Sequence, residues 1–66
     1  MYRFVEEENK IKVLKREKEG NYKVDYDFQV LEVKEIYLKG KKVNKSEILG
    51  TYFNSYKFEN GILIIN

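Results

Sequence analysis

The sequence predicts a single small domain that is mainly β, either an antiparallel β-barrel or a two-sheet sandwich, with one short helix near residues 46–53. Three observations support this prediction. The chain has 66 residues, which suits one domain. Apolar and polar residues alternate along much of the chain, the period-two pattern of strands with one buried face. Gly20, Gly40 and Gly61 separate the alternating segments, where hairpin turns are expected.

Residues 2–30 are expected to form a three-stranded antiparallel meander. The first strand covers residues 2–7. A three-residue connection through residues 8–10 would place Val5 opposite Val13 in the second strand and keep apolar side chains opposite one another.

The second hairpin of the meander is expected to close at Gly20-Asn21, because both residues tolerate positive φ. This two-residue turn places Val13 opposite Phe28. The third strand, residues 22–30, has apolar residues at every even position, which predicts one continuous buried face.

The alternation breaks after Val30, because Val30 and Leu31 are both apolar. A bulge or sharp bend near Val30–Glu32 explains the change of phase and would carry the chain from one sheet to the other. Gly40 closes the next hairpin, with Val43 returning opposite Ile36 or Leu38.

Residues 46–53 form the one helical pattern. Ser46 is a suitable N-cap, and Ile48 is spaced to contact Tyr52 one turn later. Gly50 weakens the helix, so one or two turns are expected.

Asn60-Gly61 is the strongest turn signal, typical of a type I′ hairpin. The turn pairs Phe58 with Leu63, which assigns Leu63 and Ile65 to the core. Ile62 and Ile64 then lie on the opposite face, beside charged residues of the preceding strand.

Enzyme chemistry has few candidate residues in this chain. Histidine and cysteine are absent, which removes the usual general bases, thiolate nucleophiles and soft metal ligands. The hydroxyls of Ser46, Thr51 and Ser55 have no base beside them in the sequence, and no glycine-rich phosphate loop is present. We expect no catalysis, no metal and no cofactor.

Asp25 and Asp27 are the one carboxylate pair on a strand, about 7 Å apart. Two oxygen ligands hold Mg²⁺ or Ca²⁺ poorly. We therefore interpret them as part of a solvated face opposite Arg16.

The leading hypothesis is a non-catalytic protein-binding module. Ile62–Ile65 is apolar on both faces. One face can meet the core, and the other must meet the helix, a second sheet or another chain, so the strand is either central and covered on both sides or part of an interface. Exposed β-branched residues on a terminal strand invite pairing with another chain. We expect Ile62 and Ile64 to contact a homodimer mate or a partner, with Tyr52 and Tyr56 at the margin, since tyrosine is favoured at interfaces.

The alternative is a small nucleic-acid-binding β-barrel. Chains of this size include SH3-like and OB-like barrels, and small barrels often bind nucleic acid. Its binding site would combine a basic hairpin with an aromatic platform: Tyr37, Lys39, Lys41, Lys42 and Lys45. The net charge of +2 is low for a dedicated DNA-binding protein.

The composition suggests a source. Lysine, asparagine, isoleucine, tyrosine and phenylalanine have AT-rich codons, while alanine and proline do not occur. A short chain of AT-rich origin fits a phage- or virus-encoded inhibitor or accessory factor, for example one that blocks a host defence complex. No signal-peptide pattern is visible, so a cytoplasmic location is expected, in the host if the gene is viral.

Overall fold

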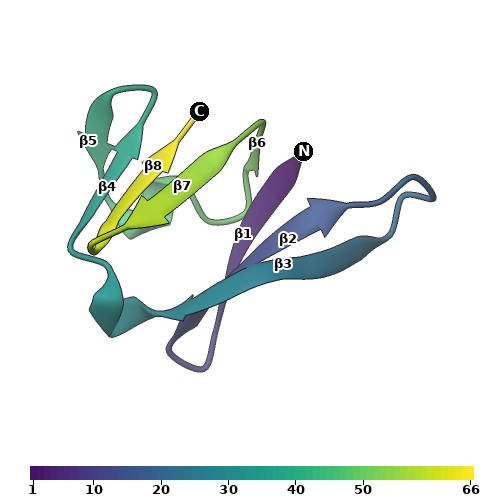
Figure 1. The fold of residues 1–66 in the computed structure, drawn as a ribbon, viewed down its shortest axis with the longest axis horizontal. Coiled ribbons are helices and arrows are strands. Elements are labelled where there is room, and N and C mark those ends of the chain that lie inside the picture. Colours follow the sequence, from purple (N-terminus) through teal and green to yellow (C-terminus); the bar gives the residue numbers. More distant parts are fainter.

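The computed structural model describes all 66 residues and contains two four-stranded β-sheets that face one another (Figure 1). The first sheet has the order β3-β2-β1-β6, formed by Tyr22–Gln29, Lys10–Arg16, Tyr2–Glu7 and Tyr52–Phe53. The second has the order β5-β4-β8-β7, formed by Lys41–Val43, Glu35–Leu38, Ile62–Ile65 and Tyr56–Glu59. Strands hold 59% of the residues, which confirms a mainly β fold, and they do not close into a barrel.

The chain crosses between the sheets at the predicted bend. The short 3₁₀ turn η1 (Val30–Glu32) follows β3 directly, and its end is closed by the backbone N–H of Val33, which donates to the carbonyl of Val30. The chain then enters β4, which pairs with β8 in parallel, the one parallel ladder between the named strands. The second sheet is therefore mixed, and the sequence did not indicate this parallel pair.

The predicted helix over residues 46–53 is wrong. The structure has one 3₁₀ turn there, η2 (Lys45–Glu47), which begins after Asn44 and not at Ser46. The Glu47 carboxylate accepts a hydrogen bond from the Asn44 backbone N–H at 2.8 Å. Gly50 then takes a φ of +79°, which a continuing right-handed helix excludes, and the chain extends into β6.

The β1–β2 hairpin has a shorter turn than the sequence predicts. Glu8 and Asn9 both take positive φ, 49° and 67°, and form a two-residue connection. Phe4 therefore lies opposite Val13, and both side chains are fully buried. A change of one residue in register moves every partner to the other face, so the predicted Val5–Val13 pair is wrong.

The β2–β3 hairpin is longer than predicted and carries a bulge. Its loop spans residues 17–21, so the predicted turn at Gly20-Asn21 is wrong. The register shifts between Val13 and Leu14, and Asp25 is left without a partner. The even positions of β3 therefore change face along the strand, and the predicted continuous buried face does not exist.

The hairpins of the second sheet have the predicted registers. Phe58 pairs with Leu63 across the Asn60-Gly61 turn, as expected. Val43 returns opposite Ile36, one of the two pairings considered. In both hairpins the turn residues take positive φ, which glycine adopts without steric cost.

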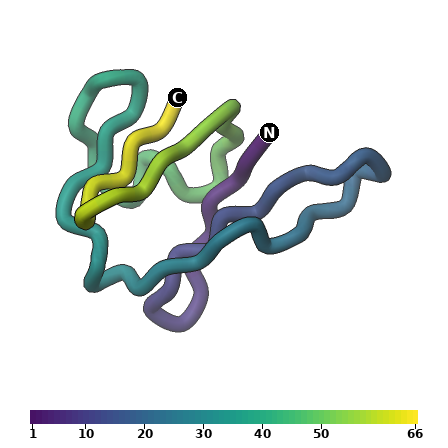
Figure 2. The backbone as a smooth tube through the Cα atoms, viewed as in Figure 1, coloured from purple at the N-terminus to yellow at the C-terminus, as the bar shows by residue number.

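The core lies between the two sheets. Its nine buried residues are Phe4, Ile11, Val13, Phe28, Ile36, Ile48, Phe53, Leu63 and Ile65. Beyond the core, the far half of the β2–β3 hairpin extends away from the rest of the chain (Figure 2). No helix of the structure is long or apolar enough to cross a membrane.

Candidate interaction surfaces

The outer side of the second sheet is open to solvent and has an apolar centre. Alternation along β8 turns Leu63 and Ile65 into the core, where both are fully buried, and Ile62 and Ile64 outward. Ile62 is half-buried and Ile64 is 40% exposed. We call this surface the isoleucine face; its residues, taken from the strand registers, are Glu35, Tyr37, Lys42, Lys57, Glu59, Ile62 and Ile64.

Polar groups around the two isoleucines are mostly paired within the chain. The Lys57 ammonium lies 3.2 Å from the Glu59 carboxylate. The Tyr37 hydroxyl donates to the Glu35 carboxylate at 3.2 Å, and the charge of Glu35, followed by this hydrogen bond, raises the pKa of Tyr37. The isoleucine face therefore has an apolar centre and a rim of satisfied polar groups.

The outer side of the first sheet carries a different surface. A row of direct cross-strand partners runs over all four strands: Val24, Leu14, Arg3 and Tyr52. Arg16 and Tyr22 form the neighbouring pair. We call this surface, made of these six residues, the arginine face. Val24 is 50% exposed and Tyr52 is 54% exposed, so the row is accessible to another molecule.

Aromatic rings and arginine meet on the arginine face. The Arg3 guanidinium carbon lies 5.9 Å from the centre of the Tyr52 ring, within the range of a cation–π contact. The Tyr22 and Tyr52 rings are stacked, with centroids 6.5 Å apart and planes inclined by 28°. Burial, followed by the neighbouring Tyr52, raises the pKa of Tyr22.

The two arginines of the chain are both unpaired. All four ion pairs in the structure use lysine as the cation, and neither Arg3 nor Arg16 takes part in one. The Nε atom of Arg3 is buried and has no hydrogen-bond partner. The arginine face therefore presents two cations whose hydrogen-bonding capacity is not used within the chain.

Tyr56 lies away from the isoleucine face, although the sequence analysis placed it at the margin. It belongs to the inner side of β7, where its ring contacts Tyr2 and Phe4 edge-on. Its hydroxyl donates to the Asp25 carboxylate of β3 at 2.5 Å. Burial, followed by this hydrogen bond, raises the pKa of Tyr56. Tyr56 thus joins the two sheets and does not extend the outer surface.

The four residues predicted to bind a protein are therefore brought together only in part. Ile62 and Ile64 are neighbours on one face, whereas Tyr52 lies on the other sheet and Tyr56 lies between the sheets. The sequence analysis missed the arginine face, because the bulge at Asp25 and the pairing of β6 with β1 create it. No local pattern in the sequence indicates either feature.

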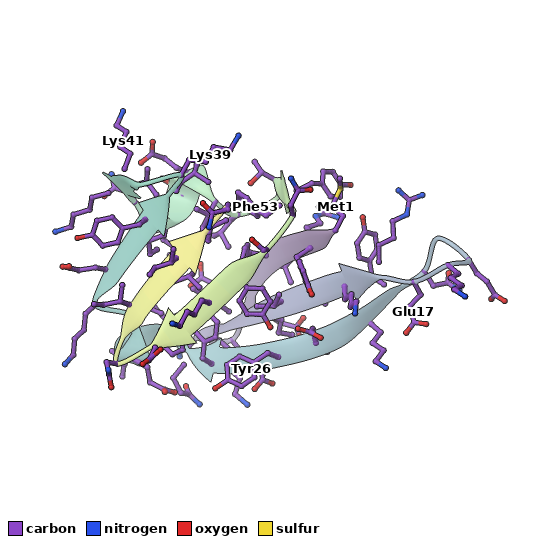
Figure 3. The ribbon with its side chains drawn as sticks, turned by 45° about the horizontal axis from the view of Figure 1, so that its top comes forward. Met1, Glu17, Tyr26, Lys39, Lys41 and Phe53 are labelled. Atoms are coloured by element: carbon purple, nitrogen blue, oxygen red, sulfur yellow. The ribbon has the colours of Figure 1, made fainter.

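Four of the five residues of the predicted basic site lie on the β4–β5 hairpin. Lys39 follows β4 and Lys41 begins β5, and both side chains extend outward (Figure 3). Lys45 is engaged with the Glu6 carboxylate at 2.9 Å. Lys42 lies beside Tyr37, whose hydroxyl is occupied by a carboxylate. Lys45 is thus drawn to Glu6, while the other four residues stay together on the hairpin.

The two aspartates of β3 also separate. Asp25 accepts the hydrogen bond from Tyr56 at the bulge and has no cross-strand partner, so its predicted position opposite Arg16 is wrong; Asp27 is the cross-strand partner of Lys12. No group of three acidic side chains is placed to hold a metal ion.

Comparison of the chain with protein-family models, curated proteins and solved structures found no match. The functional interpretation therefore depends on the isoleucine face and the arginine face themselves.

Proposed function

We propose that the chain is a non-catalytic binding module that engages a protein partner through the isoleucine face. The supporting observation is the asymmetry of β8. All four of its residues are apolar, but only Leu63 and Ile65 are fully buried within the chain, while Ile64 remains 40% exposed. Burying an exposed isoleucine stabilises a complex by up to about 1.5–3 kcal/mol, so this strand can contribute to binding without further change of fold.

The surroundings of the two isoleucines fit the same interpretation. Protein interfaces combine an apolar centre depleted in charge with a polar rim. On the isoleucine face, the Lys57–Glu59 ion pair and the Glu35–Tyr37 hydrogen bond flank the apolar centre. The rim groups satisfy one another, so a partner can cover the centre without leaving these charges unpaired.

A finer hypothesis extends this proposal to a phage- or virus-encoded inhibitor of a host defence complex. It depends on the small size and AT-rich composition of the chain. The neighbouring genes test it. Neighbours that encode phage or mobile-element proteins support it, and a conserved set of housekeeping genes contradicts it.

The test of the protein-binding proposal compares two double variants that each add two positive charges. Ile62→Lys with Ile64→Lys alters the isoleucine face. Leu31→Lys with Ser46→Lys alters exposed turns elsewhere, Leu31 being 94% exposed. Each tagged variant is used, with and without nuclease, to capture proteins from cells of the natural source, and sedimentation velocity measures self-association.

We expect the wild type and the turn variant to capture the same protein, or to form the same dimer, and the isoleucine-face variant to lose it. Circular dichroism must show that all three proteins are folded. Equal capture by the isoleucine-face variant contradicts the proposal. So does unfolding of that variant alone, because the two isoleucines would then be core residues. Capture that disappears with nuclease favours the nucleic-acid alternative.

A further inference from the structure

The arginine face offers charges that the chain itself leaves unused. We propose that this face binds an acidic segment of a protein, one in which carboxylates are interspersed with apolar side chains. The inference concerns a second surface on the opposite side of the molecule and does not depend on the isoleucine face.

The need for an anion follows from the two arginines. Arg3 and Arg16 are the only arginines of the chain, they lie on the same outer side of the first sheet, and neither has a carboxylate partner. The buried Nε of Arg3 has no acceptor. An unsatisfied buried donor is unfavourable, and a guanidinium binds a carboxylate through two parallel hydrogen bonds. Because Nε itself is buried, a carboxylate of the partner would bind the terminal Nη groups of Arg3 and the exposed guanidinium of Arg16.

The carboxylates nearest in sequence are engaged elsewhere. Glu7 lies 3.3 Å from Lys12, and Glu17 lies 3.9 Å from Lys23. Asp27 is the cross-strand partner of Lys12. Glu7 and Glu17 therefore accompany lysines, and no carboxylate of the chain pairs with either arginine.

The need for apolar side chains follows from the rest of the row. Leu14 and Val24 are adjacent partners at the β3 end of the row, and Val24 is half exposed. Tyr22 and Tyr52 present ring surface beside them. Tyrosine and arginine together are the residues that contribute most to binding energy in protein interfaces.

These features favour a protein over a nucleic acid. Nucleic-acid platforms expose aromatic rings to stack with bases and surround them with lysine and arginine. Here the β3 end of the row is aliphatic, and the lysine-rich β4–β5 turn belongs to the other sheet. Aliphatic side chains beside two arginines complement a segment that alternates acidic and apolar residues.

The experiment measures fluorescence anisotropy with three labelled probes. The first is a peptide of about ten residues in which Asp or Glu alternates with Leu or Phe, long enough to cross the sheet. The second replaces every acid by the corresponding amide. The third is oligothymidylate of similar length. We expect the acidic peptide to bind at least about tenfold more tightly than the amide peptide, as expected for loss of charge-assisted hydrogen bonds.

Two sets of variants test where the acidic peptide binds. Arg3→Gln with Arg16→Gln should weaken it by about tenfold or more. Lys34→Gln with Lys42→Gln removes the same charge from the second sheet and the approach to it, and should change affinity by less than about twofold. A second, matched pair keeps the arginines. Val24→Glu should weaken binding of the acidic peptide more than Val24→Lys, because only glutamate adds a charge of the same sign as the peptide. Circular dichroism confirms that each variant is folded.

Several results would overturn the proposal. One is absence of binding by the acidic peptide at millimolar concentration. Equal weakening by the lysine variant would show that only net charge matters. Tighter binding of oligothymidylate, lost in the arginine variant, would assign the surface to nucleic acid. Ile62→Lys with Ile64→Lys should leave peptide binding unchanged, so the two proposals can fail separately.

Discussion

The two outer faces of the molecule differ in how their charges are arranged. On the isoleucine face, Lys57 and Glu59 form an ion pair and Tyr37 is bonded to Glu35, so the polar groups are largely satisfied before any partner arrives. On the arginine face, Arg3 and Arg16 are unpaired. The first arrangement favours affinity from apolar burial, and the second favours orientation and selectivity through charge.

If the outer faces serve binding, they should contribute little to folding. Strand β8 allows the largest difference in stability between a core residue and an outer residue to be measured. Leu63 is fully buried, whereas Ile64, its neighbour in the chain, is 40% exposed. We expect Leu63→Ala to lower the free energy of unfolding by about 2–5 kcal/mol, because it leaves a cavity between the sheets. Ile64→Ala should lower it by about 1 kcal/mol or less. Urea denaturation measures both.

Similar losses in the two variants would break the comparison. They would mean that the outer side of β8 contributes as much to folding as the core, so that the isoleucine face is needed by the chain itself. Because small domains are marginally stable, Leu63→Ala is best measured at low temperature, where partial unfolding can still be resolved.

The hydrogen bond between Tyr56 and Asp25 joins the two sheets, and its removal gives the second prediction. Tyr56→Phe removes the hydrogen bond to Asp25 and should lower the free energy of unfolding at neutral pH by about 1–2 kcal/mol. The pKa of Tyr56 is raised in the folded state by burial and by Asp25, above the ordinary value of 10.0. The wild type therefore keeps this stabilisation below pH 10 and loses it as the pH rises above 10.

The difference between wild type and Tyr56→Phe should accordingly be constant from pH 7 to about 9.5 and decrease at higher pH. Urea denaturation at a series of pH values measures it. Tyr22 and Tyr37 titrate in both proteins and cancel in the difference. A difference that grows with pH would contradict the raised pKa and the contact between the sheets.

The fold was predictable at the two glycine-marked turns of the second sheet, but not at Gly20, which lies inside the longer loop of residues 17–21. Asn60-Gly61 and Gly40 set the registers of the second sheet correctly, because glycine adopts positive φ without steric cost. The β1–β2 turn uses Glu8 and Asn9 for the same geometry, and neither residue signals it as strongly. The register there is set instead by burial of Phe4 against Val13, a tertiary effect that local pattern does not contain.

Of the two candidate surfaces, the isoleucine face was predictable in part from the sequence and the arginine face was not. The division of β8 into core and outer residues follows from a correct turn and from alternation. The arginine face depends on the bulge at Asp25, which turns Tyr22 and Val24 outward, and on Gly50, whose positive φ after η2 redirects the chain so that β6 pairs with Arg3. The alternation along β3 predicts one apolar face, and it does not indicate that the bulge at Asp25 divides that face into two.

On the arginine face, we expect Arg3 to be needed for binding and not for folding, which gives the third prediction. Arg3→Met removes a buried donor without an acceptor, although it also removes the contact with Tyr52. We expect the free energy of unfolding to stay unchanged or to rise by up to about 1 kcal/mol. Arg16→Met, at an exposed position, should change it by less than about 0.5 kcal/mol. Thermal and urea denaturation measure both, and a loss above about 1 kcal/mol in Arg3→Met would show that its main role is structural.

The smallest effect is expected on the isoleucine face, at the ion pair between Lys57 and Glu59. Both side chains are more than half exposed, at 69% and 62%, so water and salt screen their attraction. A double-mutant cycle with Lys57→Gln and Glu59→Gln should give a coupling energy below about 0.5 kcal/mol, and less at high salt. The opposite charges of Lys57 and Glu59 then neutralise each other at the rim of the isoleucine face and add little to the stability of the fold. A coupling above about 1 kcal/mol would mean that these charges stabilise the sheet as much as a buried contact does. The isoleucine face would then be needed for folding, and its paired charges could not be interpreted as the rim of a binding surface.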